Sequence, residues 1–137
     1  MTIVYRLKQD QRKIDHVQRA TRTTENFGIE PTHGMFGSDE WWENIESGRL
    51  PLHTLKGKIT ELYMGSMGDW PECKIVSDTG EEKSWTRMMH SAEQDALYRV
   101  GAHIEIDYVW QQHRTKSFDH GAKTEQVIEI RIEPPGE

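Results

Sequence analysis

The feature that most constrains the fold is an alternation of apolar and polar residues that begins at His53. The stretches HTLKGKITELYM, CKIVSDTGEEKSWTR, AHIEIDYVW and VIEIRIE each carry it. A period of two is typical of β-strands with one face turned toward a core. The second stretch indicates two strands joined by a turn at Asp78, Thr79 and Gly80, because a short Gly-containing connection favours a hairpin. The sequence therefore predicts five strands.

Two of these strands have an evident buried face, and a short helical segment precedes them. We expect Ile104, Ile106 and Tyr108 to share one face of the fourth strand, because they alternate with polar residues. For the same reason we expect Ile128, Ile130 and Ile132 to share one face of the fifth strand. The stretch SAEQDALYR begins with Ser91, a residue type that caps helices, and predicts a helical turn between the third and fourth strands. The segment QHRTKSFDHGAK, between the fourth and fifth strands, is a predicted polar loop.

A helix is predicted before the first of these strands, within FGSDEWWENIESGRLPL. Ser38 can cap its start, and the two acidic residues that follow complement the helix dipole. Gly48 suits its exit, and Pro51 prevents continuation. The helix is therefore expected over about residues 39–47.

Two adjacent tryptophans stand in this helix. Trp41 lies four residues before Ile45 and Trp42 three residues before it, so all three are expected on one side of the helix. We interpret the pair as structural: a plug that faces the core, with one ring at its edge.

The first part of the chain has a weaker pattern. A short β-like start at residues 3–5 is followed over 8–20 by good helix formers with a thin apolar stripe, and then by scattered glycines and a proline. Residues 1–24 carry six basic and two acidic side chains, so they contribute +4 to a chain whose net charge is -6. We predict an N-terminal extension over residues 1–37, ordered or mobile, and one domain over 38–137.

The order of the predicted elements resembles the OB-fold over roughly residues 53–133. The resemblance depends on LKGKITELY as a first strand, the hairpin around residues 78–80, and YRVGAHIEIDYV as the exit of the helical turn and the fourth strand. It implies a mainly β protein with a five-stranded antiparallel barrel, in which the helical turn lies between strands three and four. SH3-like and other small barrels share this pattern.

The stretches FGSDEWW and GSMGDWPE also resemble a group of uncharacterised bacterial proteins, a resemblance that supplies no activity. The start of the chain lacks the basic and apolar regions of a secretory signal, and no stretch is long enough to span a bilayer. Cys73 is the single cysteine, so no intramolecular disulfide can form. We expect a cytoplasmic bacterial protein that does not bind a membrane. The oligomeric state is left open.

The sequence predicts no catalytic residue, no metal ligand and no cofactor. It lacks GxxxxGK[ST], GxGxxG and the nucleophile elbow. His113, Asp119 and His120 share one loop but have no recognised metal-binding spacing. Cys73 could pair with His90, yet its place within a predicted strand favours a structural thiol. A small metal-dependent or hydrolytic enzyme is the weakest of three alternatives.

A binding module is the main prediction. OB barrels bind ligands across strands two and three and the neighbouring loops. Aromatic rings beside cations there would suit single-stranded nucleic acid, because bases stack on rings while cations contact phosphates. A protein partner on the same face or along a barrel edge is the alternative, since acidic residues share the hairpin. Whether Trp85 faces solvent or the interior is left open. The candidate ligand-binding residues are Trp70, Lys74, Lys83, Trp85, Arg87, Arg114, Lys116 and Phe118.

Overall fold

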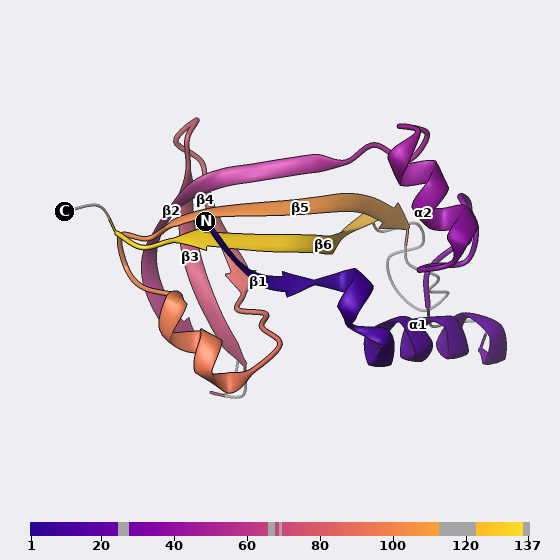
Figure 1. The fold of residues 1–137 in the computed structure, drawn as a ribbon, viewed down its shortest axis with the longest axis horizontal. Helices are drawn as coiled ribbons and strands as arrows, with labels where there is room; N and C mark the ends of the chain where they lie inside the picture. The colour runs from indigo at the N-terminus through magenta and orange to yellow at the C-terminus, as the bar shows by residue number, and fades with distance from the viewer. Residues whose placement is uncertain (25–27, 66–67, 69, 113–122, 136–137) are drawn as a thin grey trace. The chain divides into compact units, whose positions relative to one another are not determined.

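The computed structural model describes residues 1–24, 28–65, 68, 70–112 and 123–135, and its main element is one sheet. The strand order is β1-β6-β5-β2-β3-β4 (Figure 1). The strands are β1 (Thr2–Arg6), β2 (His53–Met64), β3 (Pro71–Ser77), β4 (Glu82–Thr86), β5 (His103–Gln112) and β6 (Lys123–Glu133). The helices are η1 (Leu7–Gln9), α1 (Gln11–Thr23), α2 (Asp39–Glu46) and η3 (Ala92–Leu97).

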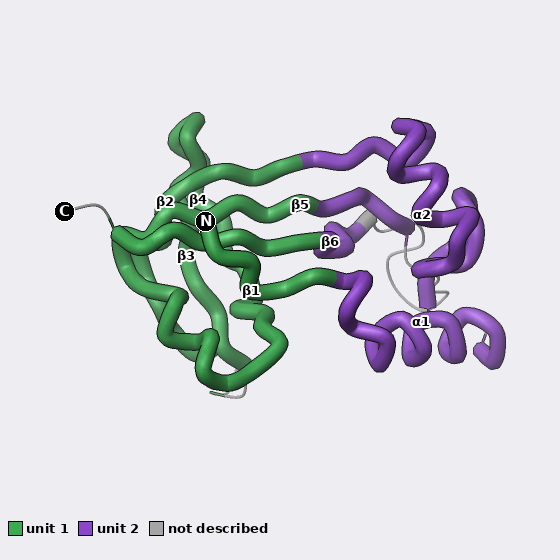
Figure 2. Tube along the Cα trace, in the orientation of Figure 1, with its two compact units in different colours: residues 1–6, 54–107, 129–137 green, residues 7–53, 108–128 purple. Residues whose placement is uncertain are grey.

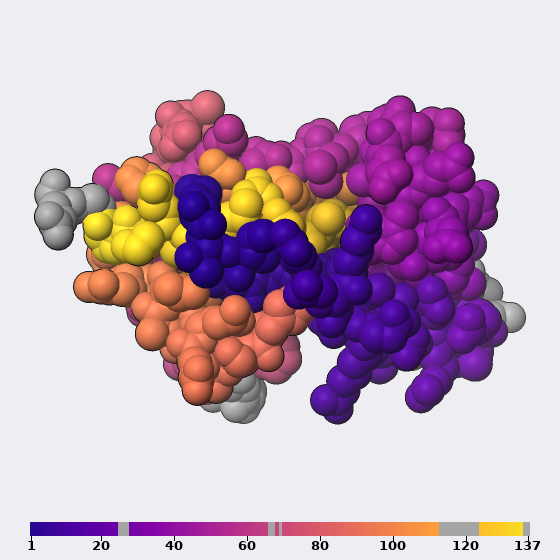
Figure 3. Space-filling model, in the orientation of Figure 1, coloured from indigo at the N-terminus to yellow at the C-terminus, as the bar shows by residue number. Residues whose placement is uncertain are grey.

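The predicted mainly β class is confirmed, but the sheet has six strands rather than five. The additional strand is β1, which pairs antiparallel with β6, and Figure 3 shows it in indigo along the yellow β6. Its five residues are too few to show a clear alternation, and its partner lies more than 100 residues later in the chain. Pairing with a distant strand, which local pattern cannot reveal, determines where this segment lies.

Residues 1–37, predicted as an extension, thus contain β1, η1 and α1 within their described part. Val4 and Leu7 are fully buried. The mobility of this segment and the domain boundary at residue 38 stay predictions.

A closed barrel is not confirmed. The six strands follow a linear order with β1 at one end and β4 at the other. The helical turn predicted between the third and fourth strands is confirmed as η3, which lies between β4 and β5.

The chain divides into two compact units (Figure 2). Unit 1 comprises Met1–Arg6, Thr54–Asp107 and Glu129–Glu137, and unit 2 comprises Leu7–His53 and Tyr108–Ile128. The core of unit 1 is built from alternate residues of its strands, together with Tyr98. The predicted turn between β3 and β4 is confirmed, with Gly80 at φ +91° and its N–H bonded to the Ser77 carbonyl.

A bulge in β2 changes which of its residues face the core. Ile59 pairs with Ile75, but Glu61 pairs with Lys74, so one residue of β2 has no partner. Cross-strand partners share a face of the sheet. Leu62, opposite the buried Cys73, therefore lies on the same side as Ile59 despite their odd spacing.

The buried face predicted for β5 is correct only in part. Ile104 and Ile106 are buried, but Tyr108 is only half-buried, and Val109 and Gln111 are buried instead. The buried positions therefore change phase within the strand. Strict alternation, on which the prediction relied, fails at such a shift.

Unit 2 contains the tryptophan pair, and the predicted plug is confirmed. The Ser38 side chain caps α2 by accepting from the Trp41 N–H, and Gly48 follows the helix at φ +82°. Trp41 is fully buried, and its Nε1–H donates to Gln111 Oε1 at 3.1 Å. Trp42 is half-buried, with Lys8 Nζ 4.9 Å from the centre of its ring.

Candidate functional site

The predicted ligand-binding residues that the structure describes do not form one continuous surface. Arg114, Lys116 and Phe118 lie outside the described residues. Trp70 is 59% exposed just before β3, whereas Trp85 in β4 is only 8% exposed. Trp85 pairs across the sheet with Cys73 and belongs to the core, so it offers no free ring face for a base.

The predicted cations on β3 and β4 differ in their surroundings. Lys74 Nζ lies 3.4 Å from a Glu61 carboxylate oxygen and 3.8 Å from one of Glu82. These carboxylates, Glu61 first, raise the pKa of Lys74. Lys83 is half-buried and pairs with Ile75, so it lies on the opposite face from Lys74.

Arg87 is a buried cation that links three parts of unit 1. Its Nη1 lies 3.0 Å from Asp95 of η3, and its Nη2 donates to the Tyr63 carbonyl at 3.4 Å, at the end of β2. The side chain is 10% exposed, and its buried Nε has no hydrogen-bond partner among the residues that the structure describes. Arg87 therefore holds structure in place rather than presenting a charge to a phosphate.

The hypothesis of a reactive Cys73–His90 pair finds no support in the geometry. Burial raises the pKa of the Cys73 thiol to about 12, so the thiol is protonated at neutral pH. His90 is engaged with β1: its ring stacks on Tyr5 at 5.1 Å, and its Nε2 accepts the Arg6 N–H at 2.9 Å. Cys73 is a structural thiol.

A network of ion pairs covers part of the sheet face of unit 1 that lies opposite its core. Arg131 of β6 contacts Glu105 and Asp107 of β5 at 3.1 and 2.7 Å, and also pairs with Glu129. Burial acts to raise the pKa of Asp107, but hydrogen bonds from Arg131 and Thr54 outweigh it, so this pKa lies below its usual value. The Asp107 carboxylate is therefore held as an ion and is not poised as a general acid.

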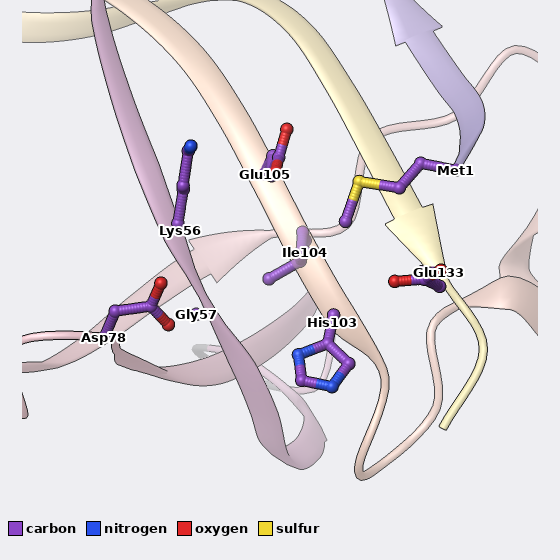
Figure 4. Close-up of a pocket in the computed structure, with 8 residues that line it drawn as sticks. All are labelled: Met1, Lys56, Gly57, Asp78, His103, Ile104, Glu105 and Glu133. Carbon is purple, nitrogen blue, oxygen red and sulfur yellow. The ribbon is translucent and has the colours of Figure 1, made fainter. Parts of the chain in front are cut away.

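A polar hollow of about 230 Å³ lies beside this network (Figure 4). Small-molecule sites are typically about 300–1,000 Å³ and mostly apolar, and this hollow is smaller and polar. Within the described part of the chain, no group of three or more His, Cys, Asp or Glu side chains could hold a metal ion. The hollow is lined by Met1, Lys56, Gly57, Asp78, His103, Ile104, Glu105 and Glu133.

Three large apolar side chains near one end of the β2–β3 hairpin are exposed. Leu62 is 36% exposed, Met64 50% and Trp70 59%. Leu62 and Met64 lie opposite Cys73 and Pro71, so these two side chains share the core side of the sheet. Of the three residues, only Trp70 was predicted, because the bulge in β2 that sets the orientation of the other two leaves no mark in the local sequence.

Comparison with known proteins identifies a family. The family model described as "Immunity protein RhsI2" matches residues 1–133. No curated protein matches the chain. Among the described residues, no helix is long and apolar enough to cross a membrane.

Proposed function

The chain belongs to the family of immunity protein RhsI2, and on this basis we propose that it binds a protein toxin and blocks its action. The match to residues 1–133 carries the proposal, because it extends over almost the whole chain of 137 residues. An immunity protein protects a cell from a toxin. Binding the toxin directly is the simplest way to do so, and it needs no catalytic group in the inhibitor.

This proposal develops the protein-partner alternative of the sequence analysis. The net charge of -6 would favour encounter with a basic partner, since complementary charge raises association rates. The ion pairs of Arg131 fix several charged side chains before any partner arrives, which lowers the entropy cost of binding.

The hypothesis that the protein binds nucleic acid is less well supported than the hypothesis that it binds a protein. Stacking requires accessible rings, and Trp85 is buried. Phosphate binding requires available cations, and Lys74 and Arg87 each contact carboxylates. An enzymatic role receives no support from the protonated Cys73 thiol.

We also propose that β2 to β6 form an OB-like arrangement. Its support is the order β6-β5-β2-β3-β4, with η3 between β4 and β5. A further link joins β1 to the segment after β4, because the His90 N–H donates to the Val4 carbonyl at 3.2 Å. A cytoplasmic location in a bacterium is likewise proposed, and fractionation of cells that express the chain would test it.

The function can be tested by co-expression. A candidate toxin is chosen from the genes that neighbour this one, and its toxic domain is induced in bacteria with and without this protein. We expect growth to be restored only when the protein is present, and the two purified proteins to co-elute in size-exclusion chromatography. A chain that neither restores growth nor co-elutes with an active toxin would contradict the proposal.

A further inference from the structure

The two edge strands of the sheet differ in what lies beside them. At β1, the Val4 carbonyl accepts the His90 N–H at 3.2 Å, and the Arg6 N–H donates to His90 Nε2 at 2.9 Å. At β4, the only paired strand among the residues that the structure describes is β3. Strand β4 is therefore an open edge of the sheet, and such an edge can accept a further strand.

The register shows which backbone groups of β4 point outward. The Ser77 N–H donates to the Glu81 carbonyl at 2.8 Å, and the Arg87 N–H donates to the Pro71 carbonyl at 3.0 Å. Hydrogen-bonded and non-bonded positions alternate along an antiparallel pair, so every second residue from Glu81 to Arg87 faces β3. The backbone N–H and C=O groups of the residues in between point away from β3. These residues are Glu82, Ser84 and Thr86.

The outward groups of β4 are accessible. Glu82 and Ser84 are exposed, and Thr86 is half-buried. Within the described part of the chain, the backbone groups of Ser84 and Thr86 have no hydrogen bond to a segment outside β3. An extended segment of a partner can therefore bond to them along the edge, which is the recognition mode called β-augmentation.

The hairpin formed by β3 and β4 is acidic. Its residues 71–86 carry four acidic and two basic side chains. Of the two cations, Lys83 lies on the opposite face from its neighbour Glu82, and Lys74 lies between Glu61 and Glu82 at 3.4 and 3.8 Å. A strand added to β4 would place a side chain beside Glu82, where Lys or Arg would be favoured by complementary charge.

This arrangement selects among possible occupants. A second copy of the chain, paired along the same edge, would bring a second acidic hairpin to the interface and would be repelled. A nucleic acid would bring phosphates, which the carboxylates also repel. An extended protein segment with basic side chains matches both the open backbone groups and the charge.

We propose that β4 is where the toxin docks, through an extended segment of the toxin that carries Lys or Arg and adds to the sheet beside β4. This inference rests on the proposed function and specifies its contact surface. The backbone groups of Ser84 and Thr86 bond to the segment, and the acidic hairpin determines which charge the segment carries.

The test is isothermal titration of the toxin's purified toxic domain into the full chain and its variants. Ser84→Pro removes an outward N–H that the pairing of β3 with β4 does not use, a position at which a sheet edge tolerates proline. We expect it to weaken binding by about 10-fold or more, because a strand cannot bond to the missing N–H. The matched control is Ser84→Ala, which keeps the N–H and should bind like the parent. Glu82→Lys should weaken binding by a smaller factor at high salt than at low salt.

Hydrogen exchange provides a second measurement that needs no variant. The amide hydrogens of Ser84 and Thr86 should exchange quickly in the free protein and at least about 10-fold more slowly in the complex with the toxic domain. The amide hydrogen of Ile75 is the internal control, because Ile75 is buried and its position faces β4. It should be protected in both states.

The outcomes separate the two proposals. Tight binding by the parent with parent-like binding by Ser84→Pro would overturn the docking edge and leave the function standing. Equal weakening by Ser84→Ala would also overturn it, as would a parent that is dimeric in light scattering and becomes monomeric as Ser84→Pro. A parent that neither binds nor protects overturns both proposals. If melting temperatures show that Ser84→Pro is unfolded, the exchange rates decide, and rates that do not change in the complex overturn the docking edge.

Discussion

Trp41 and Trp70 show two different uses of the same side chain. Trp41 in unit 2 is fully buried, contacts Phe36 at 4.7 Å, and has its Nε1–H satisfied by Gln111. Trp70 in unit 1 is 59% exposed at the end of a hairpin. Burying a large ring stabilises a fold, whereas leaving one in water stabilises nothing until a partner covers it. The first tryptophan therefore stabilises the fold, and the second contributes little to it.

The largest loss of stability is expected when the buried ring of Trp41 is removed. Trp41→Ala should lower the free energy of unfolding by about 3–5 kcal/mol, because it leaves a cavity and removes the partner of the buried Gln111 amide. Urea unfolding followed by circular dichroism measures this loss. Trp42→Ala is the matched control, since Trp42 is only half-buried and should cost clearly less. Equal losses in the two variants would show that burial does not distinguish them.

A smaller loss of stability is expected when the ion-pair network of Arg131 in unit 1 is disrupted. Arg131→Gln should cost about 1–3 kcal/mol at pH 7, because it removes the cation shared by Glu105 and Asp107, while Glu129 keeps its ion pair with Arg6. The folded-state pKa of Asp107 is lowered, so its contribution is present above the unfolded pKa of about 3.9 and lost as pH falls through the folded value. The difference between parent and variant should therefore shrink on acidification, as urea unfolding at several pH values would show. If the difference in unfolding free energy between parent and variant did not change with pH, the network would be excluded as the cause of that difference.

The smallest effect on stability is expected at the exposed ring. Trp70→Ala should change the free energy of unfolding by no more than about 0.5 kcal/mol, as is usual for surface substitutions. Thermal unfolding followed by circular dichroism provides the value. A loss as large as that of Trp41→Ala would remove the contrast between the two regions.

Local sequence signals predicted the buried tryptophan but not the exposed side chains at the end of β2. The Ser38 cap, the acidic first turn and the spacing of Trp41 to Ile45 are all local, and they led to the correct helix and its correct buried face. The orientations of Leu62 and Met64 depend on a bulge that is visible only once β2 is paired with β3. Propensity and alternation do not contain that register.

The same reason explains why the sequence indicated a short β-like segment at residues 3–5 but not its pairing in the sheet, and why the predicted site is divided. β1 acquires its partner from the other end of the chain, a relation that no local window contains. Trp85 and Lys74 were grouped as one surface, yet they lie on opposite faces of the sheet because their partners are Cys73 and Ser84. Pairing register, rather than composition, decides which side chains meet a ligand.

The most direct test of the account is titration of the purified toxin domain into the protein, with Trp41→Phe titrated in parallel. We predict saturable binding near one equivalent for the parent and parent-like binding for Trp41→Phe, because Trp41 is buried. The absence of binding by the parent to a toxin that remains active would contradict the account.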